Sequence, residues 1–209
     1  MFPLLAATAA FLQPTTSDAY RKYLLGEWEL KKAITFKAGG LSGRFEGRAS
    51  FEALDEAAPN LLAYSESGIF TSESGSTSET RNRLLYDFSE WSKVDVFYDV
   101  AVDRSSARSI VESARLLYSL VPDSAEAGVM RSAAATDGSQ AVEASEDEYR
   151  GDLQVSAENA FLSTWEVSGP AQQGHILSLF RRADASRLAE EDKRASVIIE
   201  ADGSSDQAF

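Results

Sequence analysis

The sequence predicts an all-β protein, an antiparallel up-and-down barrel of about eight strands preceded by one short helix. Apolar and polar residues alternate with a period of two through most of the chain, which is typical of strands with one buried face. Short turn-forming segments, not helices, join these stretches, and this disfavours a parallel sheet. Strands of this kind must pair as two sheets or close into a barrel to hide their edges.

Length and composition are those of one globular domain with appendages. The chain has 209 residues, of which 44% are hydrophobic and 25% charged, enough to bury a core. Its net charge of −13 repels phosphate backbones, so we expect no nucleic-acid partner. Because the chain has no Cys and one His, disulfides, thiolate zinc sites and His-rich metal sites are excluded, and we expect no cofactor.

The N-terminus begins with an apolar run over residues 2–12. The run is too short to span a bilayer, which needs ~20 residues, so we expect no membrane span. Residues 7–9 (ATA) resemble a signal cleavage site, but no Lys or Arg precedes the run. Residues 10–11 (AF) resemble the cleavage junction of plastid presequences in algae. We expect a cytoplasmic protein, with a plastid or another organelle as the alternative.

The regular elements then follow in order. Ser17 can cap a short helix that runs through Leu24 and Leu25 and ends at Gly26. After it the period changes to two, and alternation predicts a first group of five strands and a second group of three. Their alternating faces run over residues 28–36, 45–51, 62–70, 84–88 and 94–98, and then over 149–155, 161–167 and 176–182.

The middle of the chain has a different pattern. Apolar residues at helical spacing predict a helix over residues 106–121, stopped by Pro122. A strand near residues 115–120 is the competing interpretation. Residues 123–144 are rich in Ala, Ser and Gly without a period, and we expect a long acidic loop.

These patterns divide the chain into three parts. Residues 1–23 form an N-terminal segment with the short helix, residues 24–182 the barrel with a partly helical acidic insertion at 99–145, and residues 183–209 an acidic tail. The excess of negative charge lies in residues 123–152 and in the tail. It serves either as a docking surface for a basic partner or only to keep the chain solvated.

Several blocks of sequence resemble a known family. Gly26-Glu27-Trp28, with Arg181-Arg182 in the last strand, resembles the lipocalin-like or calycin signature, in which an Arg of the final strand stacks on the Trp. Five blocks in order resemble a lipocalin-like (calycin-like) family of unknown function, DUF6314. They are residues 25–30 (LGEWEL), 43–51 (GRFEGRASF), 62–68 (LAYSESG), 147–151 (DEYRG) and 165–170 (WEVSGP).

The resemblance implies a lipocalin-like barrel and no established activity. It covers about residues 24–98 and 145–182. Family members carry a His and a Cys where this chain has Val142 and Ala144, and Arg-Lys-Asp-Tyr where it has residues 171–174 (AQQG). If those polar residues perform chemistry in the family, this chain has lost it.

The inward faces of the predicted strands supply the candidate binding residues. Burying Lys32 or Glu66 singly would cost several kcal/mol, so inside a barrel they must be paired, hydrated or in contact with a ligand. Small inward residues such as Gly47, Gly68 and Gly151 leave room for a ligand. A filled core with a structural Lys-Glu pair is the alternative. The candidate ligand-binding residues are Trp28, Lys32, Tyr64, Glu66, Tyr86, Tyr149, Trp165 and Arg182.

Three functions remain open on the sequence. The first is a non-enzymatic barrel that binds a small apolar or aromatic molecule. The second is an interaction or assembly subunit that uses the insertion at 99–145 and the acidic tail to bind a protein partner. The third is a barrel enzyme or chromophore-handling factor with Lys32, Glu66 and Tyr64 as acid–base groups. His175 falls on the outward face and is not a candidate base.

Overall fold

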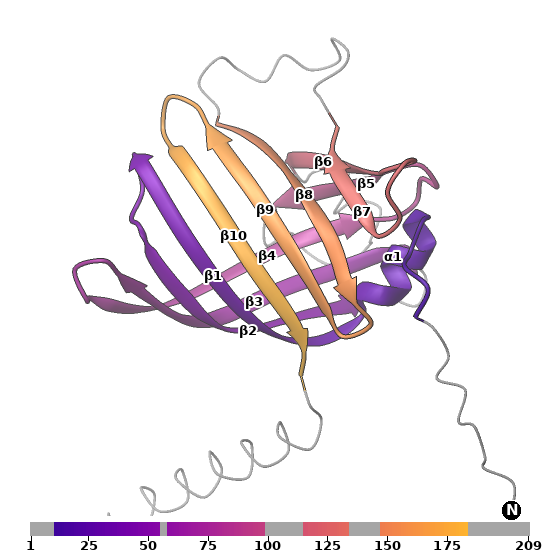
Figure 1. Cartoon of the computed structure of the whole chain (residues 1–209), viewed down its shortest axis with the longest axis horizontal. Coiled ribbons are helices and arrows are strands. Elements are labelled where there is room, and N and C mark those ends of the chain that lie inside the picture. Colours follow the sequence, from indigo (N-terminus) through magenta and orange to yellow (C-terminus); the bar gives the residue numbers. More distant parts are fainter. Residues whose placement is uncertain (1–10, 55–57, 99–114, 134–146, 184–209) are drawn as a thin grey trace, which may run out of the picture.

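The computed structural model describes residues 11–54, 58–98, 115–133 and 147–183, which form one helix and ten antiparallel strands (Figure 1). Strands adjacent in sequence are adjacent in the sheet, and β1 pairs with β10, so the barrel is closed. The elements are α1 (Ser17–Leu24), β1 (Gly26–Ala38), β2 (Gly43–Ala53), β3 (Leu61–Ser72), β4 (Thr77–Asp87), β5 (Val94–Tyr98), β6 (Leu116–Pro122), β7 (Val129–Ser132), β8 (Glu148–Ala157), β9 (Ala160–Ser168) and β10 (Gln173–Arg182).

The all-β up-and-down barrel is confirmed, but the expected number of about eight strands is wrong. The two additional strands lie in the middle of the chain. The helix expected through Val121 is replaced from Leu116 onward by β6, as the competing interpretation predicted. The expected acidic loop contains β7, which lies between β6 and β8 and pairs with both. Part of the segment expected to be an insertion is therefore barrel wall.

Helix α1 closes one end of the barrel (Figure 1). Its N-cap is Thr16, one residue before the predicted Ser17, whose hydroxyl instead donates to the Glu90 carbonyl at 2.9 Å. The Tyr23 hydroxyl lies 2.9 Å from the carbonyl oxygens of Ala157 and Ala160. The helix is thus tied to the β4–β5 and β8–β9 connections, which meet at the same end.

Burial along β1 falls with distance from this helix. Trp28 and Leu30 are 0% and 1% exposed, whereas Lys32, Ile34 and Phe36 on the same face are partly exposed. An apolar core therefore fills the helix end of the barrel, and the interior becomes accessible toward the other end.

The first and last strands are joined at the closed end by Arg182. Its guanidinium lies 3.9 Å from the centre of the Trp28 ring, in the stack that the sequence resemblance implies. It also donates to the carbonyl oxygens of Leu25 and Tyr23, while the Trp28 indole nitrogen donates to the Leu24 carbonyl at 2.8 Å. These contacts lock the end of β10 onto the start of β1 and the last turn of α1.

Predictions for the chain ends fall outside the described residues. The leader-like residues 1–10 and the acidic tail at 184–209 are both in this category. Within the described part of the chain, no helix is long and apolar enough to cross a membrane.

Candidate functional site

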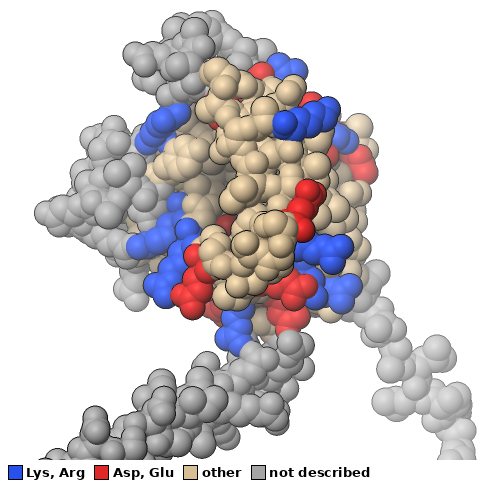
Figure 2. Space-filling model, turned by 90° about the vertical axis from the view of Figure 1, so that its left-hand side faces the viewer, with Lys and Arg blue, Asp and Glu red and all other residues tan. Residues whose placement is uncertain are grey.

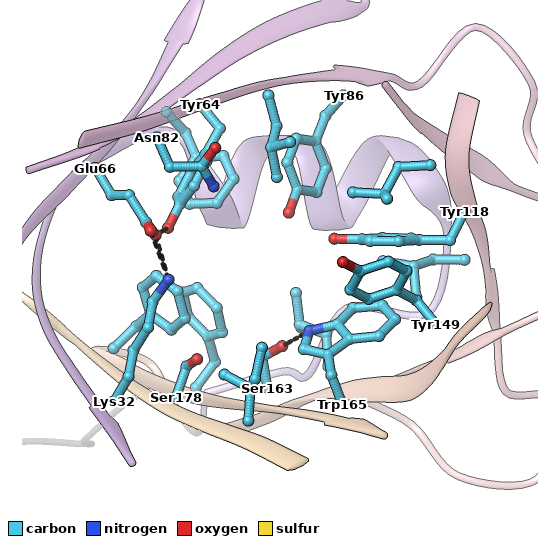
Figure 3. A pocket seen from close by; sticks show the side chains of 18 of the residues that line it. Lys32, Tyr64, Glu66, Asn82, Tyr86, Tyr118, Tyr149, Ser163, Trp165 and Ser178 are labelled. Carbon is cyan, nitrogen blue, oxygen red and sulfur yellow. Dashed lines mark hydrogen bonds and ion pairs between the residues drawn. The ribbon is translucent and has the colours of Figure 1, made fainter. Parts of the chain in front are cut away.

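A cavity of about 210 Å³ lies inside the barrel, above the apolar core at the closed end (Figure 3). Every strand except β7 contributes to its wall. The lining residues are Lys32, Phe51, Tyr64, Glu66, Asn82, Leu84, Tyr86, Tyr98, Leu117, Tyr118, Leu120, Tyr149, Leu153, Phe161, Ser163, Trp165, Ile176, Ser178 and Phe180.

One side of the cavity carries a charged cluster formed by Lys32, Glu66 and Tyr64. The Lys32 ammonium lies 2.6 Å from each carboxylate oxygen of Glu66, and the Tyr64 hydroxyl donates to the same carboxylate. The side chains of Lys32 and Glu66 are only 16% and 9% exposed. Of the three states expected for these charges inside a barrel (paired, hydrated or in contact with a ligand), the structure shows the first, and each charge compensates the other in a poorly hydrated place.

The strand register explains why this cluster forms. Lys32 of β1 is the partner of Ser178 in β10, which is in turn the partner of Ser163 in β9, so the three form one polar level of the wall. Glu66 of β3 is the partner of Asn82 in β4. The two charged residues lie on strands separated only by β2 and reach toward each other across the interior (Figure 3).

The opposite side of the cavity is aromatic. The Trp165 and Tyr118 rings have their centroids 4.1 Å apart, and Tyr149 lies 6.5 Å from Tyr118 (Figure 3). The Trp165 indole nitrogen donates to the Ser163 hydroxyl at 2.6 Å, and the Tyr86 and Tyr118 hydroxyls point toward each other (Figure 3). This wall therefore offers flat apolar surface, and its indole nitrogen already has a partner in the protein.

The tyrosines that line the cavity are held in their neutral form. Burial is the main cause that raises the pKa of Tyr64 well above its ordinary value, and the neighbouring Glu66 carboxylate adds to it. Burial likewise raises the pKa of Tyr86 to about 12 and the pKa of Tyr118 well above its ordinary value. At neutral pH these hydroxyls are hydrogen-bond donors rather than phenolates.

The structure brings together six of the eight candidate residues and leaves two outside the cavity. Lys32, Tyr64, Glu66, Tyr86, Tyr149 and Trp165 line it, and their ligand-binding role stays a prediction. Trp28 and Arg182 instead stack on each other at the closed end.

Sequence reasoning missed Tyr98, Leu117 and Tyr118 as lining residues. Tyr98 is the last residue of the apolar face predicted for residues 94–98. That alternation could have identified it as a lining residue. Leu117 and Tyr118 were assigned to a helix, and only the competing strand interpretation could have found them.

The space that we expected small inward residues to leave for a ligand is partly filled by aromatic rings. A Cβ atom on Gly47 or Gly68 would lie 2.9 or 2.8 Å from the Phe45 ring, and one on Gly151 would lie 2.7 Å from the Trp165 ring. These glycines give their space to aromatic rings, not to a ligand. The cavity lies between the rings and the charged cluster.

Other polar candidates lie elsewhere. His175 is exposed, as expected for its outward face. The Asp147 carboxylate accepts from the backbone nitrogens of Ala171 and Gln172, each at 3.0 Å, and so holds the β9–β10 turn. In the described ranges no group of three or more His, Asp or Glu side chains is arranged to hold a metal ion.

Comparisons with known proteins fit the barrel. A family model described as "Family of unknown function (DUF6314)" matches residues 24–182. Among solved structures, the chain is similar to Rv2717c from M. tuberculosis, with 12% identity and a TM-score of 0.52 over 83% of this chain and 100% of that one. No curated protein matches the sequence. The structural similarity at this identity concerns the fold alone.

Two further structures are more distant. One is a protein of unknown function of the DUF3598 family from Nostoc punctiforme, with 13% identity and a TM-score of 0.45 over 86% of this chain and 54% of that one. The other is EF1p2_mFAP2b bound to DFHBI, with 9% identity and a TM-score of 0.39 over 78% of this chain and 95% of that one.

Proposed function

We propose that this chain, which belongs to the DUF6314 family of unknown function, binds a small, partly apolar molecule inside its barrel without turning it over. The observation that supports this is the interior cavity of about 210 Å³, which has a charged cluster on one side and an aromatic wall on the other. Binding sites for small molecules combine largely apolar walls with a few placed polar groups.

The size of the cavity supports a ligand of one or two rings. An apolar protein cavity of ~150 Å³ is already large enough to hold benzene. The aromatic walls supply flat contact surface, and the partly exposed side of the barrel away from α1 supplies a path from solvent.

A lipocalin-like kinship is part of the same proposal. Gly26 and Trp28 open the first strand, and Arg182 of the last strand covers the Trp28 ring at 3.9 Å. This closure at one end leaves the opposite half of the barrel free for a ligand. A barrel that carries a ligand is expected to have one closed end and one half that holds the ligand.

A cavity-filling substitution tests the proposal. Ser178 is 4% exposed and lines the cavity, so Ser178→Leu places a larger apolar side chain in the ligand volume. The neighbouring Leu177 is 47% exposed on the outer face, so Leu177→Phe adds bulk outside as a matched control. Binding is measured with a panel of environment-sensitive aromatic dyes and by native mass spectrometry of the purified chain.

We expect the wild type and Leu177→Phe to bind the same dyes, and Ser178→Leu to lose about tenfold or more in affinity while its circular dichroism is unchanged. Equal affinity of all three proteins, or no binding by the wild type, would contradict the proposal.

The contact between Lys32, Glu66 and Tyr64 favours acid–base chemistry as a second candidate function. A hydroxyl, a carboxylate and an ammonium within hydrogen-bonding distance can exchange protons with a bound substrate. If the barrel is an enzyme, Glu66→Gln abolishes turnover of a compound identified by the binding screen and leaves its binding intact. Unchanged turnover in this variant would exclude the cluster as the catalytic group.

A further inference from the structure

We infer that the ligand is a neutral, planar aromatic molecule that carries a hydrogen-bond donor and an acceptor at one end. This inference rests on the proposed binding function and adds the ligand's charge and orientation. The polar end would contact Lys32 and Glu66, and the ring system would lie toward Trp165 and Tyr118 (Figure 3).

The first step concerns charge. Lys32 and Glu66 form a close, two-pronged ion pair, so the polar side of the cavity has both signs and no net charge. An anionic ligand there would meet the Glu66 carboxylate, and a cationic ligand would meet the Lys32 ammonium. Because the pair is poorly hydrated, water screens such like-charge contacts weakly. The pair therefore selects against ions of either sign.

The second step concerns hydrogen bonds. An ammonium has three donors, and its described contacts to the Glu66 oxygens use two. A carboxylate has about four acceptor positions, of which Lys32 and Tyr64 use three among the described contacts. One donor and one acceptor remain for a ligand. A phenolic hydroxyl satisfies both, since its oxygen accepts from Lys32 and its proton is donated to Glu66.

The third step concerns the rest of the ligand. The opposite wall is formed by rings and carries none of the charged side chains that line the cavity: Trp165 donates to Ser163, and the Tyr86 and Tyr118 hydroxyls point toward each other (Figure 3). A second charged group on the ligand would be unpaired against this wall. A flat ring system gains contact area there without a polar penalty.

The outer surface supports the same reading. Figure 2 shows the end of the molecule opposite α1, where uncharged residues occupy the middle and side chains of both signs surround them. Among the described residues in this view, neither sign alone surrounds the end, so the visible charges do not concentrate an ion at it.

Three probes of similar size and different charge test the inference on the full chain. They are 2-naphthol, 2-naphthoate and 2-naphthylmethylammonium, with affinities measured by titration calorimetry near neutral pH. We expect the wild type to bind 2-naphthol about tenfold or more tightly than either ion.

Single substitutions then shift the preference in opposite directions. Glu66→Gln leaves the ammonium of Lys32 and is expected to favour 2-naphthoate, whereas Lys32→Met leaves the carboxylate and favours the ammonium probe. The control is Lys31→Met or Glu46→Gln, which removes one partner of an exposed pair at 3.3 Å on the outside of β1 and β2 and leaves the ranking unchanged.

The wild-type ranking decides the matter even if a variant fails to fold. If an ion binds as tightly as 2-naphthol, or both variants shift the preference the same way, the inference is wrong while the binding function stands. If the wild type binds none of the probes and none of the dyes, both are wrong.

Discussion

Two separate features favour glycine at position 26. Its φ is +112°, a conformation that side chains with a Cβ rarely adopt. A Cβ there would also lie 2.9 Å from a guanidinium nitrogen of Arg182, the residue that covers Trp28. The glycine of the Gly-x-Trp pattern thus makes room for the arginine that arrives from the other end of the domain.

Replacing this glycine tests the argument. Gly26→Ala is expected to lower the free energy of unfolding by about 1–3 kcal/mol, because backbone strain and displacement of Arg182 add together. Gly75→Ala is the control, since Gly75 has φ +86° but nothing within 4 Å of its Cβ position. Urea denaturation measures both, and equal losses would show that the arginine contact contributes nothing.

Arg182 carries the contacts of the closed end. Arg182→Met removes a cation over the Trp28 ring and two hydrogen bonds to backbone carbonyls, so we expect a loss of about 2–4 kcal/mol in the free energy of unfolding. Thermal and urea unfolding measure this loss. The neighbouring exposed Arg181→Met should change stability by no more than about 0.5 kcal/mol. A comparable effect of both variants would mean that the stack is not stabilising.

At the scale of the elements, aromatic rings cover glycines where the strands approach closely. Phe45 lies over Gly47 of its own strand and over Gly68, which is the register partner of Gly47 in β3. A Cβ on Gly47 would lie 2.2 Å from the Ser67 carbonyl oxygen, so only glycine permits this approach of β2 to β3. Glycine in a strand commonly marks such a bend in a barrel.

The stability of the protein should therefore be sensitive to one methyl group added between β2 and β3. Gly47→Ala forces β2 and β3 apart and is expected to cost about 1–3 kcal/mol of stability, as in other overpacked interiors. Ser67→Ala, on the exposed side of the same pair, is the control and should be nearly neutral. Thermal unfolding followed by circular dichroism compares them. A stable Gly47→Ala variant would contradict the close approach.

Strands with clean alternation could be predicted, and those without it could not. Tyr64 and Glu66 of β3 were found because every second residue faces the interior. In β6 a register shift against β5 falls where Leu117 and Tyr118 both line the cavity, so the period of two is lost and helical spacing appears instead. Only tertiary pairing defines this strand.

Strand β7 could not be predicted for a different reason, because its four residues are too few to show a period. The cost of burying Lys32 or Glu66 alone predicted that each charge needs an ionic partner, water or a ligand, but it did not decide among the three. The resemblance implied that Arg182 stacks on Trp28, yet both were also candidate ligand-binding residues, and only the structure places them outside the cavity at the closed end.

At the scale of the whole molecule, the two halves of the barrel differ: one is packed with side chains and the other contains the cavity. The half near α1 is filled by Trp28, Phe161 and Phe180, whose rings pack edge-to-face or stacked at 4.8 and 4.1 Å. The other half encloses the cavity with its charged cluster and its tyrosines. The first half has the close packing usual of protein interiors, whereas the second keeps an unfilled volume.

The tyrosines buried in both halves should limit stability at alkaline pH. Burial raises the pKa of Tyr86, in the cavity, to about 12, and it raises the pKa of Tyr23, at the closed end, to about 12 as well. An unfolded tyrosine ionises near pH 10, so the unfolded chain loses its protons first. The contribution of these tyrosines to stability is then constant below about pH 10 and falls as the pH rises toward 12.

Each such tyrosine adds up to about 1.4 kcal/mol per pH unit to this fall. Urea denaturation at a series of pH values above neutrality measures the slope, and tyrosinate absorbance is followed in parallel. We expect the absorbance to rise together with the loss of circular dichroism, since the buried hydroxyls ionise only on unfolding. In Tyr86→Phe the slope should become shallower by about one proton's contribution. Full ionisation near pH 10 in a barrel that stays folded would show that these hydroxyls are open to water, and it would contradict the burial that raises their pKa values.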